Sequence, residues 1–491
     1  MQQRIRVPAG RRAMPGSALA QVSARPPGDY APDSGAWPAA SESYRSTGWG
    51  AEYHDSDARV FGQGGLVRAR SRAAAAQNGV AKSGIDKYVS NAIGTGIVVR
   101  SAHPDPAIRA DLHQLFDDWA EESDAAGLLD WYGQQALAVR SMLEGGEVFA
   151  RHRQRRPEDG LSVPYQVELI ESEHLPLHHN GWNGSNRIKG GIEFDPLGRR
   201  AAYWLYRSHP GAAVWDTDAI QQSRVPADQV IHLFQPLRPG QSRGVPWLSW
   251  VLARLAEIDE YDGAEVTRKK ISAMFTAFVT SANAVSDHDN PMGQQFARDL
   301  NGALAELMPG TVQFLYPGET VDFAAPKDDG SYVEFMRAQL RGIAAGMGVT
   351  YEQLVGDLTG VNYSSIRAGL LEFRRQVEMC QHQVIIHQFC RPVWRAWLRS
   401  VLIEHFPRQF ARDPDFRKWS RARWMPPAWQ WVDPEKDIKA SVLAIENGLT
   451  SRARVVASQG EDVETIDAEQ QADRQRAADL GLPYSGVAIA A

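Results

Sequence analysis

One serine in this chain has the spacing that serine hydrolases use for their nucleophile. Residues 240–244 read Gly-Gln-Ser-Arg-Gly, which places Ser242 in a G-x-S-x-G sequence between a predicted strand and a predicted helix. A nucleophile elbow requires a sharp strand-to-helix turn, whereas Pro236, Pro239 and Pro246 indicate an extended loop. We therefore expect a loop that sets the direction of the next helix. A serine hydrolase acting through Ser242 is the alternative.

The densest group of possible metal ligands follows a predicted strand. It contains two acids and three histidines: Glu171, Glu173, His174, His178 and His179. Pro176 interrupts any helix that would place two of these histidines on one face. Neither an H-E-x-x-H sequence nor a cysteine-based zinc spacing occurs. We expect a solvated loop and no metal site.

Glycine-rich and acidic segments give no sign of a cofactor. The sequence lacks a G-x-x-x-x-G-K-[ST] motif, and Gly94-Thr95-Gly96 lacks the third glycine of a dinucleotide fingerprint. The acids between Glu257 and Glu265 are spaced around a predicted helix, so they indicate a solvated face rather than a nuclease site. We expect no cofactor and no enzymatic activity.

Composition describes a folded chain that does not grip DNA strongly. The 491 residues are 43% hydrophobic, enough for several domains with real cores, and the net charge is −6. Tight non-specific DNA binding needs a basic face, so the charge fits either no DNA contact or a protein that surrounds DNA loosely. Cys380 and Cys390 lie about 15 Å apart along one predicted helix, too far for a disulfide. We expect a reducing cytoplasm, with no membrane span and no signal peptide.

The first half of the chain places helices before strands. Residues 1–55 are rich in Pro, Gly, Ser and Ala and carry five arginines before the first acid, which predicts a flexible basic arm. Helical patterns follow at 64–78, 80–93, 106–122 and 128–143. The predicted strands are Ile97–Val99, Glu147–His152, Tyr165–Ile170, Arg187–Phe194, Ala201–Tyr206 and Val230–Phe234. This order is typical of an α+β block.

Two helices flank a strand-rich insertion in the second half. The first, at 247–273, ends in the basic run Arg268-Lys269-Lys270, and the second covers Ser331–Met347. Between them, residues 276–327 contain the predicted strands Val312–Leu315 and Thr320–Phe323. A much longer helix is predicted over 364–404, bent or broken at Pro392.

The long helix begins after a small polar loop and carries an apolar seam. The loop covers Thr359–Ser365. The structural alternative is an ordinary connection between helices, capped by Asn362 or Ser364. Apolar residues then recur at spacings of four and three: Ile366, Leu370, Phe373, Val377, Cys380 and Val384. Such a seam forms one continuous contact stripe, which suits a rigid ring or channel wall.

Four segments resemble the portal proteins of lambda-type tailed phages, in that family's order. They are Gly342–Arg375, with its helix, loop and long helix; Leu237–Leu248, a turn before a helix; Gly79–Ile97, a helix closed by a Gly-x-Gly turn; and Trp431–Asp437. Together they span roughly residues 60 to 480. The resemblance implies an α+β portal architecture with wing, two-helix stem, strand-rich clip, long tunnel helix and helical C-terminal crown.

The resemblance also implies a division of the chain. The expected parts are the arm 1–55, the wing 56–245, the first stem helix 246–275, the clip 276–328, the second stem helix 329–348, the tunnel loop 349–365, the long helix 366–405 and the C-terminal crown region 406–491.

Function and partners follow from the same resemblance. The family implies a homo-oligomeric ring, a dodecamer, assembled in the host bacterial cytoplasm and placed at one capsid vertex of the virion. Double-stranded DNA would pass through it during packaging and ejection, and the terminase large subunit, the head–tail connector, capsid and scaffold proteins would dock on it. The residues expected at the tunnel are Thr359, Val361, Asn362, Tyr363, Ser364 and Arg367, and those expected in the stem channel are Arg268, Lys269 and Lys270.

Overall fold

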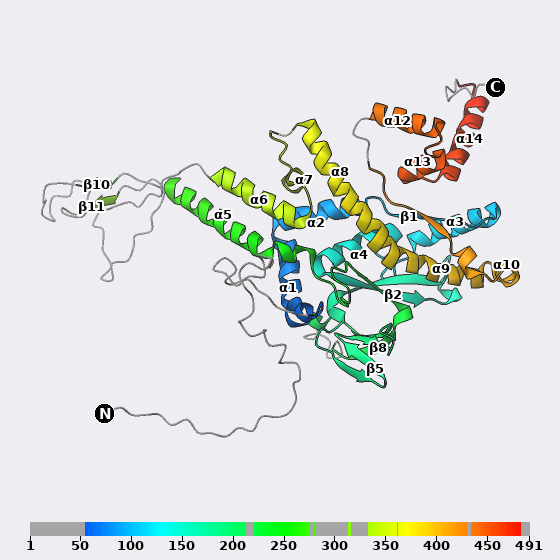
Figure 1. The fold of residues 1–491 in the computed structure, drawn as a ribbon, viewed down its shortest axis with the longest axis horizontal. Helices are drawn as coiled ribbons and strands as arrows, with labels where there is room; N and C mark the ends of the chain where they lie inside the picture. Colours follow the sequence, from blue (N-terminus) through cyan, green and yellow to red (C-terminus); the bar gives the residue numbers. More distant parts are fainter. Residues whose placement is uncertain are drawn as a thin grey trace, which may run out of the picture. The chain divides into compact units, whose positions relative to one another are not determined.

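The computed structural model describes residues 55–212, 220–273, 278–280, 313–315, 332–360, 362–429 and 434–482 (Figure 1). All of them belong to one unit that begins at Asp55. The expected basic arm therefore lies outside the described residues, apart from Asp55. None of the described helices is long and apolar enough to cross a membrane.

Four helices open the described chain: α1 (Ala58–Gln77), α2 (Gly79–Ala92), α3 (Pro106–Glu121) and α4 (Trp131–Gly145). The starts of α2, α3 and α4 have side-chain caps, whereas α1 has none. Asn78 accepts from the Ala81 amide, Asp105 from the Ala107 amide and Asp130 from the Gly133 amide. Because the Asp130 side chain accepts from the free Gly133 amide, Asp130 is the N-cap and α4 starts at Trp131. This start lies three residues after the predicted start at 128.

Strands follow in two sheets. The first is three-stranded in the order β3-β2-β9, with β2 (Glu147–Gln154) paired antiparallel to β3 (Tyr165–Glu171) and β9 (Val230–Phe234). The second is five-stranded in chain order: β4 (Gly181–Asn183), β5 (Asn186–Lys189), β6 (Ile192–Phe194), β7 (Arg200–Tyr206) and β8 (Gln222–Pro226). Helices before strands confirm a mixed fold.

The single predicted strand Arg187–Phe194 is wrong. Gly190 and Gly191 have φ of 56° and 81° and turn the chain back, so two strands form. A Cβ at Gly190 would lie 2.2 Å from the Phe61 ring, so the turn also needs glycine for space. The short strands β4 and β8 were not predicted, because three to five largely polar residues give no clear alternation.

One sheet joins distant parts of the sequence. Strand β1 (Val98–Ser101) pairs antiparallel with β12 (Ala422–Met425), in the register Val98 to Met425. Nearby lie two short helices, α10 (Pro407–Arg412) and α11 (Phe416–Trp419). The segment that follows Glu404 therefore packs on the first half of the chain.

The long helix is continuous at Pro392, where a bend or a break was expected. Helix α8 (Tyr363–Cys380), a π-helical stretch (Gln381–Cys390) and α9 (Arg391–Glu404) follow without interruption, and Figure 1 shows them as one rod. Pro392 has no amide to donate, and its ring would crowd the carbonyl four residues earlier in an α-helix. The wider winding before it, in which the Arg391 amide bonds to the Ile386 carbonyl, relieves that crowding.

Aromatic side chains fill the core between the helices and the three-stranded sheet. Trp119 stacks on Tyr165, and Trp131 stacks on Phe389 of the π-helical stretch. The Trp119 indole also donates to the Tyr165 carbonyl at 2.6 Å. Cys380 and Cys390 are both free and buried, as their spacing predicted. This core holds the long helix against α3, α4 and the three-stranded sheet.

The remaining described elements are α5 (Leu252–Ala273) after a 3₁₀ turn at Trp247–Trp250, α6 (Tyr332–Met347), α7 (Tyr351–Val355), α12 (Pro434–Glu446), α13 (Arg452–Ser458) and α14 (Val463–Asp479). Between α5 and α6, two short strands pair in parallel, β10 (Phe278–Thr280) with β11 (Gln313–Leu315). The latter confirms the strand predicted at Val312–Leu315. The strand predicted at Thr320–Phe323 lies outside the described residues.

Candidate functional site: the α5–α6 pair, the loop before α8 and their anchor

Helices α5 and α6 pack side by side through apolar residues (Figure 1). The buried residues on the two helices are Leu255, Ile258, Ile343, Ala344 and Met347. They recur at helical spacing and leave the other sides of both helices exposed. The pair is therefore amphipathic, with one face on the core and one face in solvent.

Three contacts set the register of the pair. A Cβ at Gly342 would lie 1.8 Å from Arg254 Nη1, so Arg254 lies across this glycine. The rings of Tyr261 and Phe335 are 4.8 Å apart, and the Tyr332 hydroxyl donates to Asp262. Residue numbers rise along α5 as they fall along α6, so the helices are antiparallel.

The basic run at the end of α5 is partly neutralised. Arg268 makes two hydrogen bonds to Glu265, at 2.8 and 2.6 Å. Lys269 lies 3.8 Å from the same carboxylate and 5.7 Å from the centre of the Tyr332 ring. Lys270 is exposed. Arg268 and Lys269 thus share one neighbouring acid, which lowers the charge that the run presents.

The loop before α8 is organised by one carboxylate. Asp357 accepts from the Thr359 amide at 3.0 Å and from its hydroxyl at 2.5 Å. Tyr351 donates to it at 3.2 Å, and Arg337 of α6 lies 3.3 Å away. The hydrogen bonds from Thr359 lead the causes that lower the pKa of Asp357. Asp357 therefore ties the loop to the α5–α6 pair, a contact not anticipated from the sequence.

The other predicted tunnel residues lie at the start of α8. Asn362 is exposed and precedes the helix, with its carbonyl accepting from the Ile366 amide, as expected for an N-cap position. Tyr363 and Ser364 form the first turn of α8, and Arg367 is exposed one turn further. Val361 lies outside the described residues.

The seam of the long helix is not a free surface. Phe373, Val377, Cys380 and Val384 are at most 7% exposed, while Ile366 and Leu370 are half-buried. Phe373 makes an edge contact with Tyr88 of α2, and Gln381 donates to the Ala92 carbonyl of the same helix. The sequence predicted the stripe correctly, but we expected it to serve a ring interface. It packs inside its own subunit.

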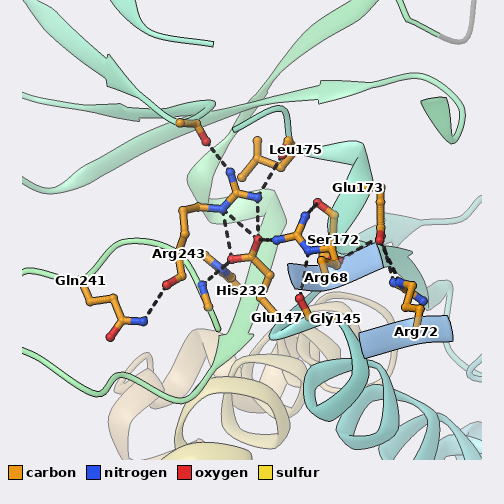
Figure 2. A network of polar contacts seen from close by, with 12 residues as sticks. Arg68, Arg72, Gly145, Glu147, Ser172, Glu173, Leu175, His232, Gln241 and Arg243 are labelled. Carbon is orange, nitrogen blue, oxygen red and sulfur yellow. Dashed lines mark hydrogen bonds and ion pairs between the residues drawn. The ribbon is translucent and has the colours of Figure 1, made fainter. Parts of the chain in front are cut away.

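A buried ion network anchors the segment that leads into α5 (Figure 2). Glu147, the first residue of β2, is fully buried. Arg243 contacts its carboxylate at 2.5 to 3.1 Å, and Arg68 of α1 donates to it at 2.8 Å. The His232 imidazole lies 3.0 Å from it, so the neutral ring donates through Nε2.

Backbone groups complete the network. Arg243 donates to the carbonyls of Gly190 and Leu175, at 2.6 and 3.0 Å. Arg68 donates to the carbonyls of Gly145 and Ser172 (Figure 2). The Gly244 amide donates to Glu147 at 2.8 Å. These bonds join α1, β2, β9, both sheets and the 235–246 loop, which we call the Arg243 loop, at one point.

Charge explains the protonation of this network. Burial raises the pKa of Glu147, but Arg243, the His232 hydrogen bond and Arg68 together hold it well below its usual value. Burial lowers the pKa of His232 to about 4. The network therefore holds a carboxylate, two guanidinium groups and a neutral imidazole at neutral pH, and it is costly to break.

The Arg243 loop is fastened at a second point beside Ser242. The Ser242 hydroxyl donates to the Asp57 carboxylate at 2.6 Å, and its amide donates to the same group at 2.8 Å. Lys189 of β5 lies 2.9 Å from Asp57. Ser242 is buried, and its hydroxyl is held by a carboxylate rather than a histidine. This geometry contradicts a nucleophile elbow and makes Ser242 an anchor.

The acid and histidine cluster is partly ion-paired. The side chains of Glu171, Glu173 and His209 lie close enough together to bind one metal ion. Arg72 of α1 already lies 2.9 Å from Glu171 and 2.8 Å from Glu173. His174 is half-buried rather than solvated, because it packs against His209. A guanidinium between the two acids makes this a structural cluster.

Sequence analysis missed the Glu147 network entirely. Its members come from four separate segments, and no local spacing brings them together. One signal was available: Glu147 stands at the start of an apolar strand, where a charge needs a partner. The sequence gives no means of choosing that partner among the many arginines.

The family of phage portal proteins of the lambda type matches residues 42–381. The chain is 28% identical over 448 residues to a probable portal protein of Halomonas phage phiHAP-1, covering 87% of this chain and 84% of that one. It is 25% identical over 347 residues to the portal protein of Escherichia phage N15, covering 65% and 64%.

Matches among solved structures come from particles of a gene transfer agent. The virion of the native particle contains a chain with TM-score 0.40 and 14% identity, covering 81% of this chain and 93% of that one. The neck of the native particle, computed with C12 symmetry, gives a TM-score of 0.38 with 13% identity, over 81% and 93%.

The family match covers more than half of the chain. The chain therefore belongs to the lambda family of phage portal proteins, which are structural components of the virion.

Proposed function

We propose that this chain forms a ring, a dodecamer, at one vertex of a phage capsid, through which DNA is packaged and later ejected. The family match over residues 42–381 carries the proposal, since this range includes the α5–α6 pair and the loop before α8. Assembly takes place in the host cytoplasm. The chain supplies no chemistry of its own, so a partner terminase provides the energy for packaging.

Each part of the chain has a task in this proposal. Residues 56–245 form the wing, α5 and α6 the stem, and residues 276–328 a clip that docks the terminase large subunit and later the head–tail connector. The wing and outer surfaces face capsid and scaffold proteins. The crown starts at α12 in this proposal, because the earlier segment through β12 pairs with β1.

The Glu147 network serves this task mechanically. Arg243 lies three residues before Pro246, where the chain turns into the helical segment that becomes α5. A stem that carries force from a motor needs a fixed junction with the wing. Several charge-assisted hydrogen bonds, all shielded from water, make the Arg243 loop that junction.

The loop before α8 serves as the tunnel constriction in this proposal. The side chains expected at the constriction are uncharged, and one of them is aromatic: Thr359, Val361, Asn362, Tyr363 and Ser364. Arg367 adds one cation. Weak phosphate contact suits a passage, because each phosphate neutralised would add salt-sensitive affinity. Lys269, Lys270 and Arg268 would face DNA further along the stem.

Electron microscopy of the purified full-length protein tests the proposal. We expect closed rings with a central channel wide enough for duplex DNA, and a mass by light scattering many times the 54.4 kDa of one chain. Deleting residues 276–328 should abolish terminase docking while the wing stays folded. A protein that remains monomeric at high concentration across a range of salt concentrations contradicts the ring.

A further inference from the structure

The exposed side of α5 carries two carboxylates without partners. Glu257 and Glu260 are exposed, one turn apart, on the side of α5 opposite its buried residues. Neither makes a hydrogen bond or an ion pair with the rest of the described chain. The residues around them, Ala253, Ala256, Gly263 and Ala264, are small. This side of α5 is therefore acidic and can be approached closely.

The exposed side of α6 has the opposite charge. Arg341 is exposed and lies over the Tyr351 ring at 5.5 Å, but no described carboxylate pairs with it. Arg337, one turn earlier, is 40% exposed and shares Asp357 at a loose 3.3 Å. Ala338 and Ala345 lie beside Arg341 on the same side. The α5–α6 pair thus presents an acidic side and a basic side.

The two sides match in height along the pair. Arg254 is level with Gly342, and Tyr261 is level with Phe335. Glu257 consequently lies midway between the levels of Arg337 and Arg341, and Glu260 lies level with Met336, next to Arg337. Copies related by rotation about an axis parallel to the pair would bring acids and guanidinium groups together without any axial shift.

We propose that the acidic side of α5 in one copy packs against the basic side of α6 in the next copy around the ring. The interface is heterologous, since each copy uses two different surfaces, and repetition of it closes a ring. Pairing of Glu257 and Glu260 with Arg341, and in part with Arg337, fixes register and direction. Phe335, 42% exposed at the edge, adds apolar contact. This inference rests on the proposed ring.

Charge reversal tests the interface, because every proposed ion pair joins one carboxylate of α5 to one guanidinium of α6. Glu257→Arg and Arg341→Glu, each alone, should raise the protein concentration needed for assembly by about tenfold or more. The double variant restores the pair with inverted polarity, so assembly should return to near the parental level. Light scattering across a dilution series measures all four proteins, and circular dichroism checks that each is folded.

Glu404→Arg provides the matched control. Glu404 is exposed at the end of α9 and makes no ion pair with the described residues, so its reversal should leave assembly unchanged. A control that loses assembly as strongly as Arg341→Glu would contradict a specific interface. It would mean that net charge alone governs association.

A cysteine pair tests the same contact without relying on the charge variants. Glu257→Cys combined with Arg341→Cys should give a ladder of covalent multimers under oxidation, while either cysteine alone should not. The native Cys380 and Cys390 are buried, so their background is low. Rings of the parent, with normal assembly of both reversals and no ladder, overturn this interface but keep the proposed function. A parent that stays monomeric overturns the proposed function itself.

Discussion

Two polar regions of this chain differ in how completely their groups are bonded. In the Glu147 network, the carboxylate is fully buried and contacts two guanidinium groups, an imidazole and a backbone amide. In the loop before α8, Thr359, Asn362 and Arg367 are exposed, and Asp357 provides the main internal support. The same kinds of side chain thus build a fixed junction in one place and an adaptable surface in the other.

The comparison teaches where rigidity is needed. A buried ion pair is only weak evidence for net stability, but its partners become costly when separated. Such a network fixes geometry, as the Arg243 loop requires. Exposed groups contribute little to stability and can change partner, as a moving cargo requires.

Removing the central carboxylate should have the largest effect. Glu147→Ala leaves Arg68 and Arg243 buried without a counter-charge, so the free energy of unfolding should fall by about 3–5 kcal/mol. Urea denaturation followed by circular dichroism measures this loss. Glu404→Ala, at an exposed position, should change it by less than about 0.5 kcal/mol. Equal effects for the two variants would remove the contrast between buried and exposed charges.

Acid should weaken the junction through His232. Its folded pKa, about 4, lies below the ordinary 6.5, so the unfolded chain binds a proton first. Stability is therefore complete above pH 6.5 and falls as the pH drops toward 4, by up to about 3 kcal/mol from this group. The depressed pKa of Glu147 extends the loss below pH 4.5. Thermal unfolding from pH 7.5 to 4 measures the slope.

Substituting the imidazole should flatten that slope. His232→Gln keeps a donor near Glu147 but does not titrate, so the loss between pH 6.5 and 4 should shrink. Buried His152, with a pKa of about 4, retains part of the slope. His387→Gln, on the exposed side of the long helix, should leave the slope unchanged. A His232→Gln variant with the full parental slope would show that acid acts elsewhere.

Much of the fold could be predicted from local pattern, whereas the networks could not. Proline at 106 and Asp105 before it place the start of α3. Strand β12 was missed because its partner β1 lies far away in the sequence, and four mixed residues show no period. The heptad-like seam predicts that a stripe is buried, but its period cannot tell a neighbouring helix in the same chain from one in another copy.

Ser242→Ala should lower the free energy of unfolding by less than Glu147→Ala does. Ser242→Ala removes a hydrogen bond to the Asp57 carboxylate, which should lower the free energy of unfolding by about 1–3 kcal/mol. Ser249→Ala is the matched control, since its hydroxyl is buried without a partner and its loss should be nearly neutral. A hydrolase would instead keep its stability and lose cleavage of a p-nitrophenyl ester. Parental ester cleavage that depends on Ser242 contradicts the anchor role.

Substitutions in the loop before α8 should have the smallest effect on stability. Their effect on DNA packaging should be much larger than their effect on stability. Asn362→Ala with Tyr363→Ala should change the free energy of unfolding by less than about 1 kcal/mol, because Asn362 is exposed. Ring assembly should persist, while packaging efficiency or retention of packaged DNA falls.

Asn362→Lys should instead tighten phosphate contact and slow translocation, more strongly at low salt. Gln471→Lys, at an exposed position on α14, adds the same single charge and serves as the control. If both loop variants package and retain DNA like the parent, the loop is a plain helix connection, and the contrast between fixed junction and adaptable passage must be sought elsewhere along the stem.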